Sequence, residues 1–200
     1  EESDEEGVQT LEDGYELIVE TASLEAILSS NTPESTIVPF GTTTEVARFE
    51  LEPENEDVDL KEIYFQNTSY DGATANQLAD NFVSATVKLF DSSGTELYSE
   101  SRTVFSEDAA TDDFVVFGNE SDIFEEAAPG VVLYQDRSEL DWELEEDESY
   151  DLVLELTAKQ NAAGANAPVS GALVSIMLEE ITFDDGTGPD NEQTIEVTAE

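Results

Sequence analysis

Residues 150–156, YDLVLEL, decide the fold class, because they alternate more cleanly than any other stretch of the chain. Tyr150, Leu152, Leu154 and Leu156 share one parity. Successive side chains of a β-strand point to opposite faces of its sheet, so this parity is expected to lie in an apolar core. The stretch therefore predicts a strand with one buried face.

The same kind of pattern extends over most of the chain. Residues 83–89 alternate up to the turn Asp91–Gly94, and Leu97 resumes the pattern, which predicts a β-hairpin. Trp142 alternates with leucines on both sides, which favours a core position over a sugar-stacking one. The other predicted strands are residues 15–29, with a bulge or bend near Ala22, 36–40, 46–51, 58–65, 113–118, 131–135, 140–144, 173–183 and 194–198.

These strands predict an all-β chain with one β-sandwich, of the jelly-roll or immunoglobulin-like type. We expect residues 23–200 to form the sandwich domain. Residues 1–22 are expected to be an acidic lead followed by a strand that is a candidate for donation to a neighbouring molecule.

The charge of the chain limits its habitat and partners. Fifty acidic residues against six basic ones give a net charge of -44. Repulsion among so many carboxylates acts over roughly 10 Å at ordinary ionic strength and over about 3 Å in molar salt. The carboxylates are spread over every predicted strand and turn, so we expect a folded protein of a high-salt organism. The same charge opposes a phosphate backbone and predicts that the chain does not bind nucleic acid.

The composition also limits the kinds of catalytic and metal site that the chain can form. The chain has no cysteine and no histidine, so it lacks thiolate nucleophiles and the commonest general base and metal ligand. With fifty carboxylates, a pair at glycosidase-like separation is expected by chance. We therefore expect a protein that is not an enzyme and has no cofactor.

One turn has a composition typical of calcium sites. Asp184, Asp185, Asp190 and Asn191 bring oxygen ligands into a short loop that contains glycine. The loop lacks the order of an EF-hand. A solvated acidic turn is the prediction for these residues, and a structural Ca²⁺ is the alternative.

Location is predicted from three features. The chain has no run of 18 apolar residues, so the mature chain is not expected to insert in a membrane. It begins at Glu1 without an initiator methionine, as removal of a signal peptide, or trimming, would leave it. Two sequons, at Asn67 and Asn119, are compatible with secretion and are candidate glycosylation sites. We expect an extracellular protein at the cell surface.

Several stretches resemble β-sandwich domains of secreted surface-layer and pilus-type filament proteins. Residues 32–65 have a proline, a Gly-Thr-Thr turn, a strand with Ala-Arg-Phe, an Asn-Glu-Asp turn and a further alternating strand. Residues 87–104, VKLFDSSGTELYSESRTV, are similar to the strand–hairpin–strand unit of that family, and residues 143–159 to its edge turn and long strand. The resemblance implies the fold and a role in assembly, and it implies no catalytic residues.

The long N-terminal strand has two interpretations that the sequence leaves open. It is either the first strand of the chain's own sandwich, or all or part of Tyr15–Ala22 completes the sheet of a neighbouring subunit. In the second case Tyr15, Leu17 and Val19 would fill a groove of the neighbour. Donation from head to tail does not close on itself and so builds an open filament.

These features predict a structural subunit of an extracellular filament or surface layer, assembled from copies of itself. The alternative is a monomeric calcium- or carbohydrate-binding module of a larger adhesin.

Overall fold

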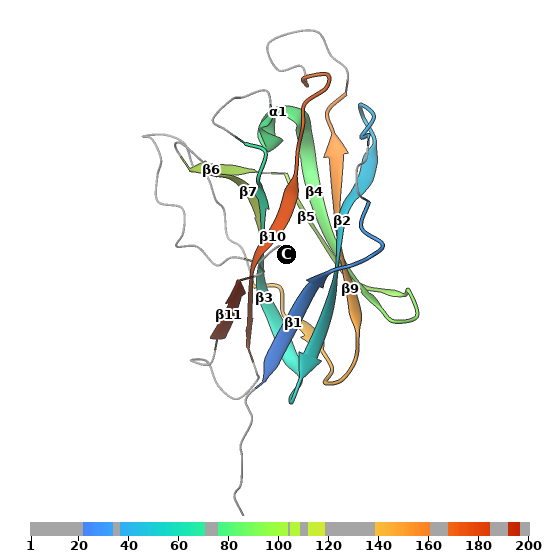
Figure 1. Cartoon of the computed structure of the whole chain (residues 1–200), viewed down its shortest axis with the longest axis vertical. Coiled ribbons are helices and arrows are strands. Elements are labelled where there is room, and N and C mark those ends of the chain that lie inside the picture. Colours follow the sequence, from blue (N-terminus) through green and yellow to red (C-terminus); the bar gives the residue numbers. More distant parts are fainter. Residues whose placement is uncertain are drawn as a thin grey trace, which may run out of the picture.

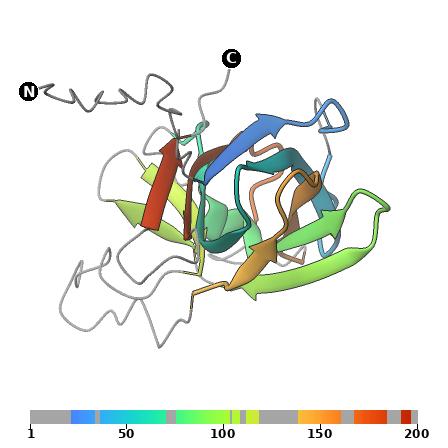
Figure 2. The ribbon, with the colours of Figure 1, turned by 90° about the horizontal axis from the view of Figure 1, so that it is seen from below.

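The computed structural model describes residues 22–33, 37–70, 76–103, 105–108, 112–118, 139–160, 168–184 and 192–196. These residues form two antiparallel sheets that pack face to face, as the alternation predicts (Figure 1). Seen along the sandwich, the two sheets lie as separate layers (Figure 2). The all-β sandwich predicted from the sequence is confirmed.

The first sheet has the strand order β1-β2-β9-β4-β5. Its strand at the centre is the one that residues 150–156 predict, and Leu152, Leu154 and Leu156 are all fully buried. The bounds of its strands are β1 (Ser23–Leu28), β2 (Thr43–Glu54), β9 (Tyr150–Ala158), β4 (Phe82–Asp91) and β5 (Glu96–Arg102).

The second sheet has the order β11-β10-β3-β7-β6, and β8 also pairs with β3. Because β7 pairs with residues 63–66 of β3 and β8 with residues 58–60, these two strands follow each other along the same side of β3. The bounds are β3 (Val58–Asn67), β6 (Ser106–Asp108), β7 (Asp112–Phe117), β8 (Trp142–Leu144), β10 (Ile176–Asp184) and β11 (Glu192–Glu196).

A single turn of helix, α1 (Leu78–Asn81), leads into β4. In the part of the chain that the structure describes, no helix has the length and apolar character needed to cross a membrane.

Aromatic side chains join the two sheets. Phe49 of β2 and Phe65 of β3 approach with ring centroids 6.1 Å apart, so they link the sheets at the centre of the core. Trp142 stacks on Tyr98 of β5 with centroids 5.5 Å apart, and only 5% of its surface is exposed. The prediction that Trp142 belongs to the core is confirmed, and the indole has no open face for a sugar.

The β4–β5 hairpin is also confirmed. Its turn is closed by hydrogen bonds from the Asp91 amide to the carbonyl of Thr95 and from the Gly94 amide to the carbonyl of Asp91. Gly94 has a φ of +81°, which glycine adopts without steric cost. The hydroxyl of Ser93 and the amide of Thr95 donate to the Asp91 carboxylate, and these bonds lower its pKa below the ordinary 3.8.

Most of the few basic side chains lie among carboxylates. Arg48 pairs with Glu45 at 2.9 Å and with Asp151 at 2.7 Å, and its hydrogen bond to Glu45, helped by that to Asp151, raises the pKa of the guanidinium. Lys88 pairs with Glu155 at 3.0 Å. Other pairs join Lys61 to Asp141 and Arg102 to Glu100.

One predicted strand is wrong. Residues 37–40 of the expected strand 36–40 carry no strand structure, and the Thr42 amide donates to the carbonyl of Pro39 to form a turn. Pro39 has no amide hydrogen for a sheet ladder, and Gly41 has a φ of +71°. Ile37 in this segment is 91% exposed, so its side chain does not belong to the core.

Candidate binding groove

An apolar groove with a volume of about 580 Å³ opens between the two sheets. None of the 22 described residues that line it is charged, although 28% of the chain is charged, a proportion that would place about six charged residues in a set of this size. Its lining includes Leu28, Ile37, Val38, Phe40, Val46, Phe82, Leu156, Val169, Leu173, Val174 and Ile176. The groove is therefore an apolar region in an otherwise acidic protein.

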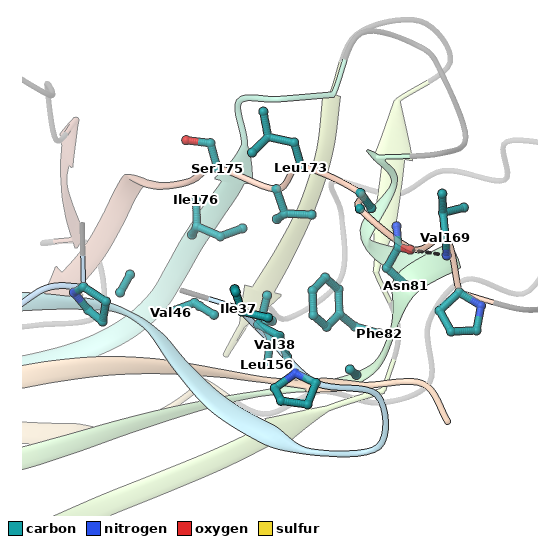
Figure 3. Close-up of a pocket in the computed structure, with 18 of the residues that line it drawn as sticks. Ile37, Val38, Val46, Asn81, Phe82, Leu156, Val169, Leu173, Ser175 and Ile176 are labelled. Atoms are coloured by element: carbon teal, nitrogen blue, oxygen red, sulfur yellow. Dashed lines mark hydrogen bonds between the residues drawn. The ribbon is translucent and has the colours of Figure 1, made fainter. Parts of the chain in front are cut away.

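The groove has two rims and a floor. Figure 3 shows Ile37 and Val38 on one side and Leu173 and Ile176 on the other, with Phe82 between them. Three of its apolar residues are highly exposed: Ile37 is 91%, Leu173 69% and Leu28 62% accessible to solvent. Contiguous exposed apolar side chains of this kind mark sites of interaction.

Among the described residues, the outer strands pair along only part of the sandwich edge, and the groove lies beside the remaining part. β1 pairs with β2 from Glu54 to Phe49, while β2 continues to Thr43. In the other sheet, the described residues of β11, Glu192–Glu196, pair with β10 from Glu180 to Asp184. Among the described residues, no strand lies beside Ile176–Leu178 on that side of β10. One half of the edge is closed by β1 and β11, and the other half contains the groove.

Three asparagines hold the rim formed by residues 168–176. The side-chain oxygen of Asn81 accepts from the Val169 amide at 2.9 Å, as the dashed line in Figure 3 marks. The oxygens of Asn76 and Asn67 accept in the same way from Leu173 and Ser175, at 3.2 and 3.3 Å. A neutral amide satisfies the backbone without bringing charge to the groove, as a carboxylate would.

Asn67 also belongs to a buried network. It is 1% exposed, and its Nδ2 donates to the carbonyl of Asn76 and to Asp113, both at 2.8 Å. The Leu78 amide donates to the same Asp113 oxygen at 2.7 Å. Nδ2, the atom that would carry an N-linked glycan, donates both of its hydrogens within this network. Asn67 has a structural role.

We expect Asn81→Ala to destabilise the protein by about 2 kcal/mol, because it removes the bonds to the Val169 amide and to the Gln77 carbonyl in a buried place. The Val169 amide should then exchange its hydrogen faster. Denaturant unfolding and hydrogen exchange in molar salt measure the two effects. Asn31→Ala, at an exposed position, is the matched control, and equal values for the two variants would contradict the role of Asn81.

The described chain begins at the opposite end of the sandwich from the groove. The carbonyl of Ala22 accepts from Gln193 of β11 at 3.2 Å, and Ala22 is 1% exposed. Ser23 pairs with Glu54, whereas Val46 and Ala47 line the groove, so about 23 Å of β2 separates the two levels. Figure 1 places the start of β1 and the strand β11 at the lower end, and α1 at the upper end.

The other residues predicted to form sites are described only in part. Tyr15, Leu17, Val19, Asp185, Asp190, Asn191 and Asn119 lie outside the described residues. Asp184 ends β10, opposite Asp59 of β3 and Glu192 of β11. Within the described ranges, no three histidine, cysteine, aspartate or glutamate residues come together as a metal site would require.

The groove itself was not predicted, although the sequence holds a signal for it. Residues 160–178 form the longest stretch without a charged residue, 19 positions in a chain with 28% charged residues. The second half of this stretch forms one rim. No protein-family model matches the chain, and no curated protein matches its sequence, so the functional argument depends on the groove and the residues around it.

Proposed function

We propose that this protein is a non-catalytic structural subunit of an extracellular filament or surface layer in a high-salt organism, assembled by β-strand complementation. In this proposal the donor segment is residues 15–21. It stops before Ala22 because that residue is buried in the chain's own fold. The partners are further copies of the same chain.

The observation that carries the proposal is a groove whose described lining is uncharged, beside a stretch of β10 with no described strand on its outer side. An edge that ends in solvent presents unpaired main-chain groups, which an added strand satisfies, and pockets along the edge select its side chains. Among the described residues, Ile176–Leu178 have no strand on the outer side of β10 and lie next to the apolar groove. A protein with a net charge of -44 would gain little by keeping such a surface exposed.

The donor segment has suitable chemistry. Tyr15, Leu17 and Val19 share one parity, and burial of each side chain contributes about 1.5 to 3 kcal/mol before the cost of ordering. Main-chain hydrogen bonds to an edge strand add to this. Glu16 and Glu20 fall on the opposite parity and remain in water, where salt screens them.

The test is truncation in about 3 M salt, where repulsion between subunits is screened. The full-length chain is expected to polymerise, and deletion of residues 1–21 should abolish polymers while the sandwich remains folded. Deletion of residues 1–14 is the matched control, because it removes the acidic lead and keeps the donor segment. Negative-stain microscopy, light scattering and circular dichroism measure assembly and folding.

A full-length chain that stays monomeric near 21.8 kDa under these conditions would contradict the proposed function and favour an isolated binding module. Polymers that form equally well without residues 1–21 would remove this segment as the donor. The β11 strand would then be the next segment to delete.

A further inference from the structure

We propose that β1 is a salt-dependent strand, which leaves β2 when the salt concentration falls while the rest of the sandwich is still folded. The charges that release it lie on the outer face of the first sheet. This behaviour belongs to the single subunit, so it goes beyond the proposed function and does not depend on assembly.

The outward side chains of β1 meet a row of glutamates on β2. Glu25 lies directly opposite Glu52 in the antiparallel register, and its diagonal neighbours on the same face are Glu50 and Glu54. Side chains directly opposite have Cβ atoms about 5 Å apart, and diagonal neighbours are about 7–8 Å apart. Like charges in these positions oppose the pairing of the two strands, and salt screens them.

The described basic side chains lie elsewhere and do not balance this row. Arg48 is on the same face, but it bonds to Glu45 of its own strand and to Asp151 of β9. Lys159 follows β9 at the level where β2 starts, far from Glu52. The other described basic residues, which pair with carboxylates away from β1, are Lys61, Lys88 and Arg102. Among the described residues, screening by salt is therefore what relieves the repulsion between β1 and β2.

The apolar contacts of β1 are few. Of its six residues only Leu24 is buried, and Ile27 and Leu28 are 46% and 62% exposed. By comparison, β9 at the centre of the same sheet buries six of its nine residues. Because so little apolar surface holds β1, a modest increase in repulsion is enough to open it before the core opens.

The two ends of β1 are held by hydrogen bonds between uncharged groups. Before the strand, the carbonyl of Ala22 accepts from Gln193 at 3.2 Å. After it, the Ser29 amide donates to the Arg48 carbonyl at 3.0 Å, and the Thr32 hydroxyl bonds both the carbonyl and the amide of Arg48. The end of β1 is thus tied more firmly than its start, so release should begin at the start. The fixed part of the fold would then begin at Ser29 instead of Ala22.

β5, the other outer strand of this sheet in the described order, has no such repulsion on its outer face. Ser99 lies opposite Lys88, and Ser101 lies opposite Thr86, with their two hydroxyls 2.8 Å apart. The pairing of β5 should therefore respond to salt much less than that of β1, which makes β5 an internal control.

Hydrogen exchange of the full-length chain at two salt concentrations tests the proposal. One is about 3 M, and the other is the lowest at which the amides of β9 stay protected, so that the sandwich is intact. Light scattering selects a protein concentration at which single subunits predominate. We expect exchange of the β1 amides to rise about tenfold at the lower salt, first at Ser23–Glu25, and that of the β5 amides by less than about threefold. An equal rise in β1 and β5 would overturn the proposal.

Glu25→Lys tests whether the glutamates are the cause, because it places a positive charge opposite Glu52. The position is exposed, so the fold should survive, which the thermal unfolding curve checks. We expect β1 in this variant to respond to salt no more than β5 does. Glu143→Lys is the matched control, since it makes the same change of charge at an exposed position of β8 in the other sheet, and it should keep the full response of β1. A response that persists in Glu25→Lys, or that is lost equally in both variants, would overturn the role of these glutamates.

Discussion

Leu154→Asp is expected to unfold the protein or to destabilise it by about 5 kcal/mol or more, which is comparable to the whole stability of many domains. Leu154 is fully buried at the centre of the first sheet, opposite Ala47 on one side and Val87 on the other. An aspartate there would place a carboxylate among apolar side chains with no basic partner. Denaturant unfolding followed by circular dichroism in molar salt measures the loss.

Glu155→Gln is the matched control one position along the same strand. Its side chain points to the outer face and pairs with Lys88 at 3.0 Å. A partly exposed ion pair of this kind contributes at most about 1 kcal/mol, and salt weakens it further. If the two variants were equally stable, the orientation of β9 would be wrong.

Strands with one buried and one solvent-exposed face were predicted well, because the alternation of apolar and polar residues is a local feature of the sequence. β9, β8 and the β4–β5 hairpin each show an alternation that burial in a sandwich imposes residue by residue. The positions of Leu154 and Trp142 follow directly from it. The turn at Asp91–Gly94 was equally local, since Asp91 hydrogen-bonds residues only two and four positions away.

The groove could not be predicted in this way, because it depends on where two strands from distant parts of the chain stop. β1 ends opposite Phe49, and the described part of β11 ends opposite Glu180; neither position is marked in the alternation of β2 or β10. Residues 37–40 are apolar because they line the groove, and the same character made them resemble a strand. The feature of the sequence that indicates the groove is the absence of charged residues from position 160 to position 178.

The asparagines explain how an acidic chain keeps one region neutral. In a sequence with 50 acidic residues, the backbone of the groove rim is held by Asn67, Asn76 and Asn81. A carboxylate at these positions would also accept from an amide, but Nδ2 of Asn67 and of Asn81 donates to a carbonyl as well. Ionised aspartate has no hydrogen to donate, so it could not make the bonds that Asn67 and Asn81 donate to these carbonyls.

Low salt is expected to unfold the isolated subunit. At about 50 mM salt the carboxylates repel across more than 10 Å, and only six basic residues oppose them. The midpoint of thermal unfolding should therefore fall steeply between about 3 M and 50 mM salt, and the fold should be lost at the lower end. The chain without residues 1–21 is the fair sample, since assembly would protect the native one. Equal midpoints in both conditions would contradict a fold that depends on screening.

Charge itself, and not another effect of salt, is tested in the turn between β8 and β9. Glu145, Glu146, Asp147 and Glu148 are consecutive and exposed, and their replacement by glutamine and asparagine lowers the net charge from -44 to -40. The variant should stay folded at a lower salt concentration than the native chain. Glu→Asp exchange at Glu145, Glu146 and Glu148 keeps the charge and is the control; Asp147 is left unchanged there, because its φ of +61° favours aspartate or asparagine. The Glu146 main-chain amide donates to Asp57, and side-chain substitutions keep this donor. A shift shared by both variants would assign the salt dependence to something other than repulsion.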